Sequence, residues 1–173
     1  MPISTTITEC TNDGSNMRLY YNISGDCATP VYVEHVGIVG DLQITDTSDE
    51  NQLMRRGSLG TIKTFNPGDE DVSVSGTQIV DGNYQGFLVI NSARKGNSAV
   101  DFLILTGPLT EVNSVGYRGK WWNFERSISG PAEGEQEASF NLKPAACSDC
   151  AVRAVKIAVA NTPADWDTSV FSG

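Results

Sequence analysis

The sequence predicts an all-β domain, an antiparallel β-sandwich or barrel with one flanking α-helix and extended arms at both ends. Its length of 173 residues is close to the common size of a single domain, so we treat residues 1–173 as one unit. The 17 glycines and the many Ser, Thr, Asn and Val residues favour short strands joined by turns. Several segments also alternate polar and apolar residues, which is the period of a half-buried strand.

The first half of the chain predicts two strands followed by a long irregular segment. Residues 18–24 alternate, and residues 31–45 form a second strand that two glycines interrupt. Residues 46–68 begin with a polar run and end in Asn-Pro-Gly, so we predict a long loop. Loops of more than about 15 residues inside a compact domain are usually functional or disordered. Apolar side chains within this segment favour a loop that makes contacts: Leu53, Met54, Leu59, Ile62 and Phe65.

A further strand and the one expected helix follow. Residues 69–80 alternate, with Val72 and Val74 on the inward face. Asp81 can cap a helix that covers about residues 82–95. The buried face of this helix would carry Phe87, Ile90 and Ala93.

The second half of the chain predicts more strands and a polar tail. Residues 100–106 are apolar on both faces, which indicates a central strand covered on both sides. Residues 117–128 and 135–142 are predicted to pair as a hairpin, joined by a loop at residues 129–134. The last strand covers residues 153–159, and the two arms cover residues 1–16 and 161–173.

The charge and the hydropathy of the chain exclude several classes of function. Lys and Arg number 12 against 21 Asp and Glu, a net charge of −9, which excludes ordinary nucleic-acid binding because affinity for phosphate comes mainly from Lys and Arg. The first residues have neither a basic nor an apolar region, so no secretory signal is expected. Apolar runs do not exceed four residues, whereas a membrane-spanning helix needs about 20, so we expect a soluble protein without a membrane partner.

No catalytic motif stands out in the sequence. The chain has no phosphate-binding G-x-x-x-x-G-K-[ST] and no G-x-G-x-x-G after a predicted strand. His35 is the single histidine, no G-x-S-x-G elbow presents a serine, and no spacing singles out a pair of carboxylates. We therefore predict no catalytic residue, no cofactor and no enzyme activity, and we assign His35 a structural or surface role.

The four cysteines leave three chemical states open. Cys147 and Cys150 form a C-x-x-C, whereas Cys10 and Cys27 stand apart. The cysteines can be free thiols, form one or two disulfides, or bind zinc, which is favoured by a second C-x-x-C that this chain lacks. We expect no metal site. The candidates for a disulfide are Cys10, Cys27, Cys147 and Cys150.

Two adjacent tryptophans suggest an alternative function. Exposed aromatic side chains stack on sugar rings, so Trp121 and Trp122 would suit a carbohydrate-binding or adhesion module. Neighbouring residues on a strand face opposite sides of the sheet, so we expect one tryptophan in the core and the other on the far face. The outer one would equally suit a subunit interface, where aromatic residues are enriched.

The order of the predicted elements carries a family resemblance. A polar arm precedes T-P-V-Y-V-E-H-V-G-I-V-G-D-L at residues 29–42, and the long loop ends in S-L-G-T-I-K at residues 58–63. An alternating strand, a helix and a buried strand lead to G-K-W-W-N-F-E-R-S-I at residues 119–128 and E-Q-E-A-S-F-N-L-K at residues 135–143. This order resembles that of the major tail tube proteins of long-tailed, siphovirus-like bacteriophages, over roughly residues 29–143.

The resemblance implies a self-assembling structural protein of the virion tail. It implies a homohexameric ring in which each subunit adds four strands to one inner barrel, and rings that stack into a tube. Those strands would lie at about residues 41–45, 69–80, 117–128 and 135–142. The implied partners are the chain itself, the tape measure, tip and terminator proteins at the tube ends, and DNA as transient cargo. The protein would be made in the cytoplasm of the host bacterium.

An acidic tube would suit the passage of DNA. Six copies with a net charge of −9 each would carry about −54, and such a wall repels phosphate and offers it no basic site. The residues expected to face the lumen are Asp71, Ser73, Ser75, Glu135 and Glu137. The residues expected to contact a neighbouring ring, together with the arms, are Leu53, Met54, Arg55 and Arg56.

Overall fold

The computed structural model describes residues 17–57, 60–95, 98–146 and 149–165, and for residues 49–70 and 95 it describes the backbone alone. The elements in chain order are β1 (Arg18–Asn22), β2 (Tyr32–Glu34), β3 (Ile38–Gly57), β4 (Gly60–Ile79), α1 (Gln85–Lys95), β5 (Val100–Leu105), β6 (Val115–Asn123), β7 (Ser127–Ser129), β8 (Glu137–Pro144), β9 (Arg153–Val159) and β10 (Thr162–Asp165). The predicted class, an antiparallel all-β fold with one flanking helix, is confirmed.

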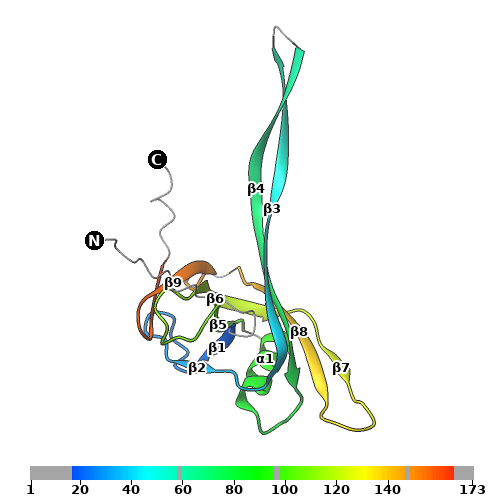
Figure 1. The fold of residues 1–173 in the computed structure, drawn as a ribbon, viewed down its shortest axis with the longest axis vertical. Coiled ribbons are helices and arrows are strands. Elements are labelled where there is room, and N and C mark those ends of the chain that lie inside the picture. Colours follow the sequence, from blue (N-terminus) through cyan, green and yellow to red (C-terminus); the bar gives the residue numbers. More distant parts are fainter. Residues whose placement is uncertain (1–16, 58–59, 96–97, 147–148, 166–173) are drawn as a thin grey trace, which may run out of the picture.

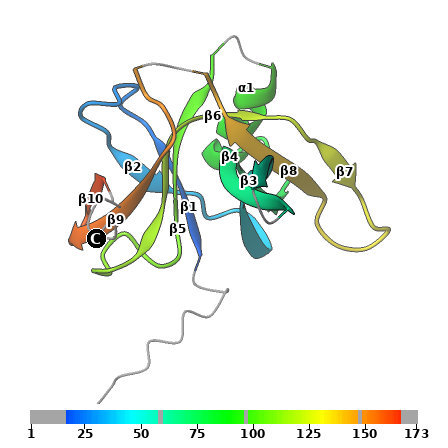
Figure 2. The same ribbon diagram turned by 90° about the horizontal axis from the view of Figure 1, so that it is seen from above.

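The strands form one antiparallel sheet that forks at β6. One edge of β6 pairs with β5, and its other edge pairs with β9 at residues 115–118 and with β8 at residues 121–123. One arm of the fork continues from β8 to β4 and β3 and carries β7, whereas the other arm carries β9 and β10. Figure 2 shows β7 and the β9–β10 pair on opposite sides of the domain. Within the described residues the sheet does not close into a barrel.

The main hydrophobic core brings together β1, β5 and β6, the β3–β4–β8 arm and α1. Its largest members include Trp121, Phe102 and Phe140, whose side chains are fully buried. The predicted buried face of α1 is confirmed, because Phe87, Ile90 and Ala93 are all buried. Val72 and Val74 point inward as predicted.

Strand β5 is covered on both faces, as its apolar sequence predicts. Phe102 and Ile104 belong to the main core, whereas Leu103 and Leu105 pack in a second cluster with Val155 and Ile157 of β9. Strand β9, with Tyr20 of β1, thus covers the second face of β5.

Residues 46–68, predicted as a loop, instead belong to a long β-hairpin. Strands β3 and β4 pair from Ile38 and Gln78 to Gly57 and Gly60. Strand β8 accompanies β4 only over Val74–Ile79, so among the described residues the outer part of the hairpin pairs only with itself, and it projects from the domain (Figure 1). Two paired strands satisfy each other's backbone hydrogen bonds without needing an apolar face. The sequence of these strands therefore lacks the polar–apolar alternation by which a strand is predicted.

The single strand predicted at residues 117–128 is divided into β6 and β7. The Asn123 side chain causes the break, because its Oδ1 atom accepts hydrogen bonds from the backbone N–H groups of Glu125 at 3.2 Å and Asn141 at 3.1 Å. A side chain thus takes the place of a ladder partner, and the chain leaves the sheet until Ser127.

The helix and the C-terminal strand also differ from expectation. Helix α1 begins at Gln85 rather than near residue 82, because Asp81 Oδ1 accepts from the Asn83 N–H at 2.9 Å and holds a turn before the helix. Part of the predicted C-terminal arm forms β10, which pairs with β9, and residues 1–16 and 166–173 lie outside the described residues. No helix in the described ranges is long and apolar enough to cross a membrane.

Candidate functional site

The β3–β4–β8 arm has one polar face. Residues on β4 whose side chains oppose Val72 and Val74 align with polar residues on both neighbouring strands, as in the row Gln43, Ser75 and Asn141. We call this surface the polar face. It consists of Gln43, Thr45, Thr47, Asp71, Ser73, Ser75, Thr77, Glu137, Ser139, Asn141 and Lys143. It lies on the opposite side of the sheet from the main core.

Four of the five residues expected to face a lumen share the polar face. Asp71, Ser73 and Ser75 lie on β4, and Glu137 lies on β8 opposite Ile79. Glu135 is exposed but precedes β8, so it does not belong to the strand. Asp71 and Ile79 are eight positions apart, which separates the carboxylates of Asp71 and Glu137 by about 26 Å along the strand.

The described part of the polar face has a small negative excess. Lys143 Nζ lies 3.9 Å from Asp71 Oδ2, and Ser139 Oγ donates a hydrogen bond to Glu125 Oε1 at 3.3 Å. Two carboxylates of the polar face (Asp71, Glu137) and the Glu125 carboxylate held beside it by Ser139, against one ammonium group (Lys143), leave a charge of −2 here. The polar hydroxyl and amide groups between them carry no charge.

The two outer strands of this arm present open edges. Strand β3 pairs only with β4, and β7 pairs only with β8, among the described residues. Strand β7 is exposed at all three positions, and the Ile128 side chain is 46% exposed. Unpaired N–H and C=O groups on such edges are templates for pairing with another chain.

The hairpin gives the residues expected to reach a neighbouring ring a defined backbone. Leu53 pairs with Thr64, Met54 with Lys63, Arg55 with Ile62 and Arg56 with Thr61, near the tip of the hairpin. Their side chains lie outside the described part of the structure.

A cluster of polar side chains surrounds a disulfide near the first residues of β5. Cys27, in the β1–β2 loop, is bonded to Cys150, in the segment before β9. The carboxylate of Asp101 lies 3.6 Å from Cys27 Sγ and accepts a hydrogen bond from Asn22 Nδ2 at 2.9 Å. Burial raises the pKa of Asp101, while Asn22 and the Arg118 guanidinium oppose that rise.

The disulfide decides the state of two of the four cysteines. Cys27, Asp101 and Cys150 are close enough to share an ion, but the sulfurs are bonded to each other and so are not the thiolates that zinc requires. Cys10 and Cys147 lie outside the described residues. Sequence reasoning did not find Asp101, whose only signal is a carboxylate within the apolar run of β5.

The two tryptophans face opposite sides of β6, as expected. Trp121 is fully buried in the main core. Trp122 pairs with Lys143 and is half-buried. It lines a shallow hollow of about 440 Å³ together with Arg94 and Phe124.

Comparison with solved structures identifies the fold. Neither protein-family models nor curated proteins match the chain. A chain in the tail of an empty gene transfer agent particle, refined with C6 symmetry, matches with a TM-score of 0.61 and 12% identity, over 78% of this chain and 95% of that one. The SPP1 tail tube matches with a TM-score of 0.55 and 19% identity, over 76% of this chain and 74% of that one. The chain has the tail tube fold.

A contractile relative extends the likeness. A chain of the sheath–tube complex of an extracellular contractile injection system, PVC, matches with a TM-score of 0.52 and 12% identity, over 90% of this chain and 99% of that one. At identities of 12–19%, this chain shares the course of its backbone with these structures, but few of its side chains. The fold expected from the order of the sequence elements is confirmed.

Proposed function

We propose that this protein is a structural, non-catalytic subunit of a phage-type tail tube. Six copies close into a ring, rings stack into a tube, and DNA passes through the tube during ejection into the host. The protein is then a component of the virion tail, made in the host cytoplasm. Tape measure, tip and terminator proteins meet the tube at its ends.

The open-edged sheet carries this proposal. Strands β7, β8, β4 and β3 form a four-stranded arm whose outer strands have no second neighbour in the described residues. Pairing of β3 in one copy with β7 in the next would satisfy both edges and continue the sheet around a ring. Six such arms would contribute four strands each to one barrel, in keeping with the C6 symmetry of the gene transfer agent tail.

The polar face supplies a wall for the lumen. Because the other face of the same strands packs on the main core and α1, ring closure would turn the polar face toward the channel. Six copies of the −2 charge described above amount to about −12, which repels DNA phosphates and leaves them few cations to bind. Asp71, Ser73, Ser75 and Glu137 are the proposed lumen residues, with Glu135 at the rim.

The hairpin supplies the contact between rings. It projects from one end of the domain, with its outer part beyond the reach of β8 (Figure 1). A two-stranded ladder of this length is stabilised when a neighbouring subunit covers it. Leu53, Met54, Arg55 and Arg56, near its tip, are the proposed contact residues, together with the arms at residues 1–16 and 161–173.

Electron microscopy of the purified full-length protein tests the proposal. Negative-stain images should show tubes or six-membered rings, and the sixfold average should place the hairpin along the tube axis. A monodisperse monomer at every protein concentration and salt condition tried would contradict it.

One observation favours a second candidate, a carbohydrate-binding module. Trp122, Phe124 and Arg94 line one open hollow, and Phe124 is 64% exposed. Aromatic faces beside a cationic side chain can bind sugars. A glycan array with the wild type and the Trp122→Ala variant separates the two functions, because a tube subunit should show no signal that depends on Trp122.

A further inference from the structure

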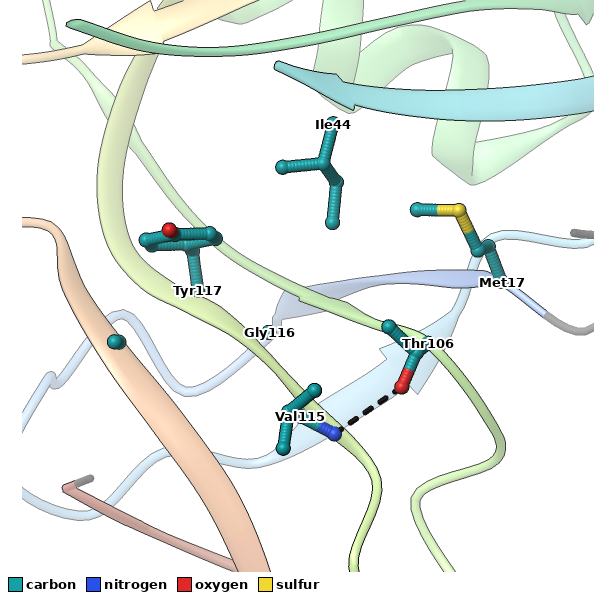
Figure 3. A pocket seen from close by; sticks show the side chains of 7 residues that line it. Met17, Ile44, Thr106, Val115, Gly116 and Tyr117 are labelled. Carbon is teal, nitrogen blue, oxygen red and sulfur yellow. Dashed lines mark hydrogen bonds between the residues drawn. The ribbon is translucent and has the colours of Figure 1, made fainter. Parts of the chain in front are cut away.

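An apolar pocket of about 360 Å³ opens at the foot of the hairpin. Figure 3 shows its lining, to which β3, β6 and β9 contribute together with Met17, just before β1, and Thr106, just after β5. The lining residues are Met17, Ile44, Thr106, Val115, Gly116, Tyr117 and Ala154. Most of these side chains are apolar, so water in the pocket would find few hydrogen-bond partners. Burial of a further apolar side chain there would stabilise the fold.

The register of three strands points from this pocket to a particular residue. Tyr117 on β6 pairs with Ala154 on β9. On the other side of β9, β10 runs antiparallel, and Ala164 pairs with Lys156 and Asp165 with Val155. If the chain continued this register by one more step, Trp166, which lies outside the described residues, would stand opposite Ala154 in one row with Tyr117.

The alternation of side chains along β9 and β10 indicates which of them face the pocket. Val155 and Ile157 face the second apolar cluster, so Ala154 and its cross-strand partners face the other side of the sheet, where the pocket lies. Asp165 lies on the Val155 side and pairs there with Arg153 at 2.5 Å. A residue that continued β10 with the same alternation would therefore face the pocket, and Trp166 is the next residue in the sequence.

We infer that the indole of Trp166 of the same chain docks in this pocket. Ala154 is small, so the neighbouring large side chain can lean over it toward Val115 and Ile44. An aromatic ring buries about 150–250 Å² in such a site, and the Thr106 hydroxyl is a polar group within the lining that can accept from the indole N–H. The docking does not depend on tube assembly.

Nuclear magnetic resonance of the full-length protein tests this inference, in solution or, for assembled tubes, under magic-angle spinning. Cross-peaks between the Trp166 indole and the methyl groups of Ile44 and Val115 are expected. They should disappear in Trp166→Ala and persist in the matched variant Phe171→Ala, which changes an aromatic residue of the same segment. The melting temperature of Trp166→Ala should fall by about 4 °C or more relative to Phe171→Ala.

Mixed labelling distinguishes the occupants of the pocket. One half of the sample carries labelled tryptophan and the other half labelled methyl groups, so that only contacts between copies give cross-peaks. Cross-peaks in the uniformly labelled sample but not in the mixed sample support docking within one chain. Cross-peaks in the mixed sample would make a second copy the occupant and overturn the inference, as would their absence from both samples.

Discussion

His35 and Gln78 are joined by a buried hydrogen bond of 2.9 Å between Nε2 and Oε1. Nδ1 of the same ring accepts from the backbone N–H of Gly37 at 3.1 Å, so Nε2 carries the proton and donates it to Gln78. The ring is 4% exposed, and its neighbours belong to β4 and α1. The single histidine thus joins separate elements in its neutral form, which is the structural one of the two roles, structural or surface, that the sequence predicts.

The neutral state of His35 predicts a loss of stability in mild acid. Burial lowers the pKa of His35 below its ordinary value of 6.5, although the Gln78 hydrogen bond opposes this. Just below pH 6.5 the imidazole therefore binds a proton in the unfolded chain but not in the folded one. The contribution of His35 to the free energy of unfolding is full above about pH 6.5, and it falls by up to about 1.4 kcal/mol per pH unit as the pH drops below that value. Urea unfolding at pH 7.5 and 5.5 measures the change.

The variant His35→Asn supplies the control for this pH dependence. It should be about 1–3 kcal/mol less stable at pH 7.5, because Gln78 loses its partner. The difference in unfolding free energy between pH 7.5 and 5.5 should shrink in the variant. An equal pH dependence in both proteins would show that other groups cause it.

Gly86 is predicted to be required beside the His35 ring. A Cβ atom at Gly86 would lie 2.7 Å from His35 Cδ2, and the ring is fixed by two hydrogen bonds. Gly86→Ala should therefore cost about 1–3 kcal/mol of unfolding free energy. The matched variant Gly82→Ala, where a Cβ meets nothing within 4 Å, should change stability by less than about 0.5 kcal/mol. Equal denaturation midpoints for the two variants would refute the packing argument.

Reduction of the disulfide should weaken the fold. The bond between Cys27 and Cys150 spans 123 residues of chain, and loss of a cross-link over a long loop typically costs about 2–5 kcal/mol. The double variant Cys27→Ala, Cys150→Ala should unfold at lower urea concentration than the wild type, and a reducing agent should then have no further effect on it. A wild type whose midpoint is indifferent to the reducing agent would contradict this expectation.

A charge on the open edge of β7 should block ring formation. Lysine on an edge strand opposes pairing with another chain, so Ile128→Lys should yield folded monomers in place of rings and tubes. Val159→Lys is the matched control, because Val159 is 65% exposed on β9, in the other arm of the fork. Sedimentation and negative-stain images should show assemblies for the control alone. Tubes formed by Ile128→Lys would exclude β7 from the ring interface.

A reversed charge on the polar face should make assembled tubes bind DNA. Glu137→Lys changes the charge of this surface by +2 per copy, and phosphate binding follows such cations and weakens with salt. Glu111→Lys makes the same change at an exposed position between β5 and β6. Filter retention of DNA at low salt should rise for Glu137→Lys and less for Glu111→Lys. Equal retention would place Glu137 outside the channel.

The sequence predicts those elements whose pattern reflects burial. The alternation of β4 and β8, the apolar run of β5 and the buried face of α1 all arise from burial, and periodicity predicts each of them, although β8 begins at Glu137 rather than at residue 135. The bounds of β9 agree with the prediction residue for residue. Such elements can be predicted because at least one face of each is apolar.

The features missed from the sequence depend on partners far along the chain. The outer part of the hairpin forms because β3 pairs with β4, and polar residues can do this without an apolar face. The break after β6 depends on the hydrogen bond that Asn123 Oδ1 accepts from the backbone N–H of Asn141. The choice of Cys27 and Cys150 among four cysteines depends on the approach of the β1–β2 loop to the segment before β9. No local sequence pattern predicts these long-range contacts.

The link between Cys27 and Cys150 also closes a covalent ring of chain that contains the whole hairpin. A protease that cuts between Gly57 and Gly60 leaves two pieces that remain attached to each other while the bond is oxidised. Such a nicked protein runs as one band on a non-reducing gel and as two bands after reduction. In the proposed tail tube, a subunit clipped there would therefore lose no fragment while the bond is oxidised.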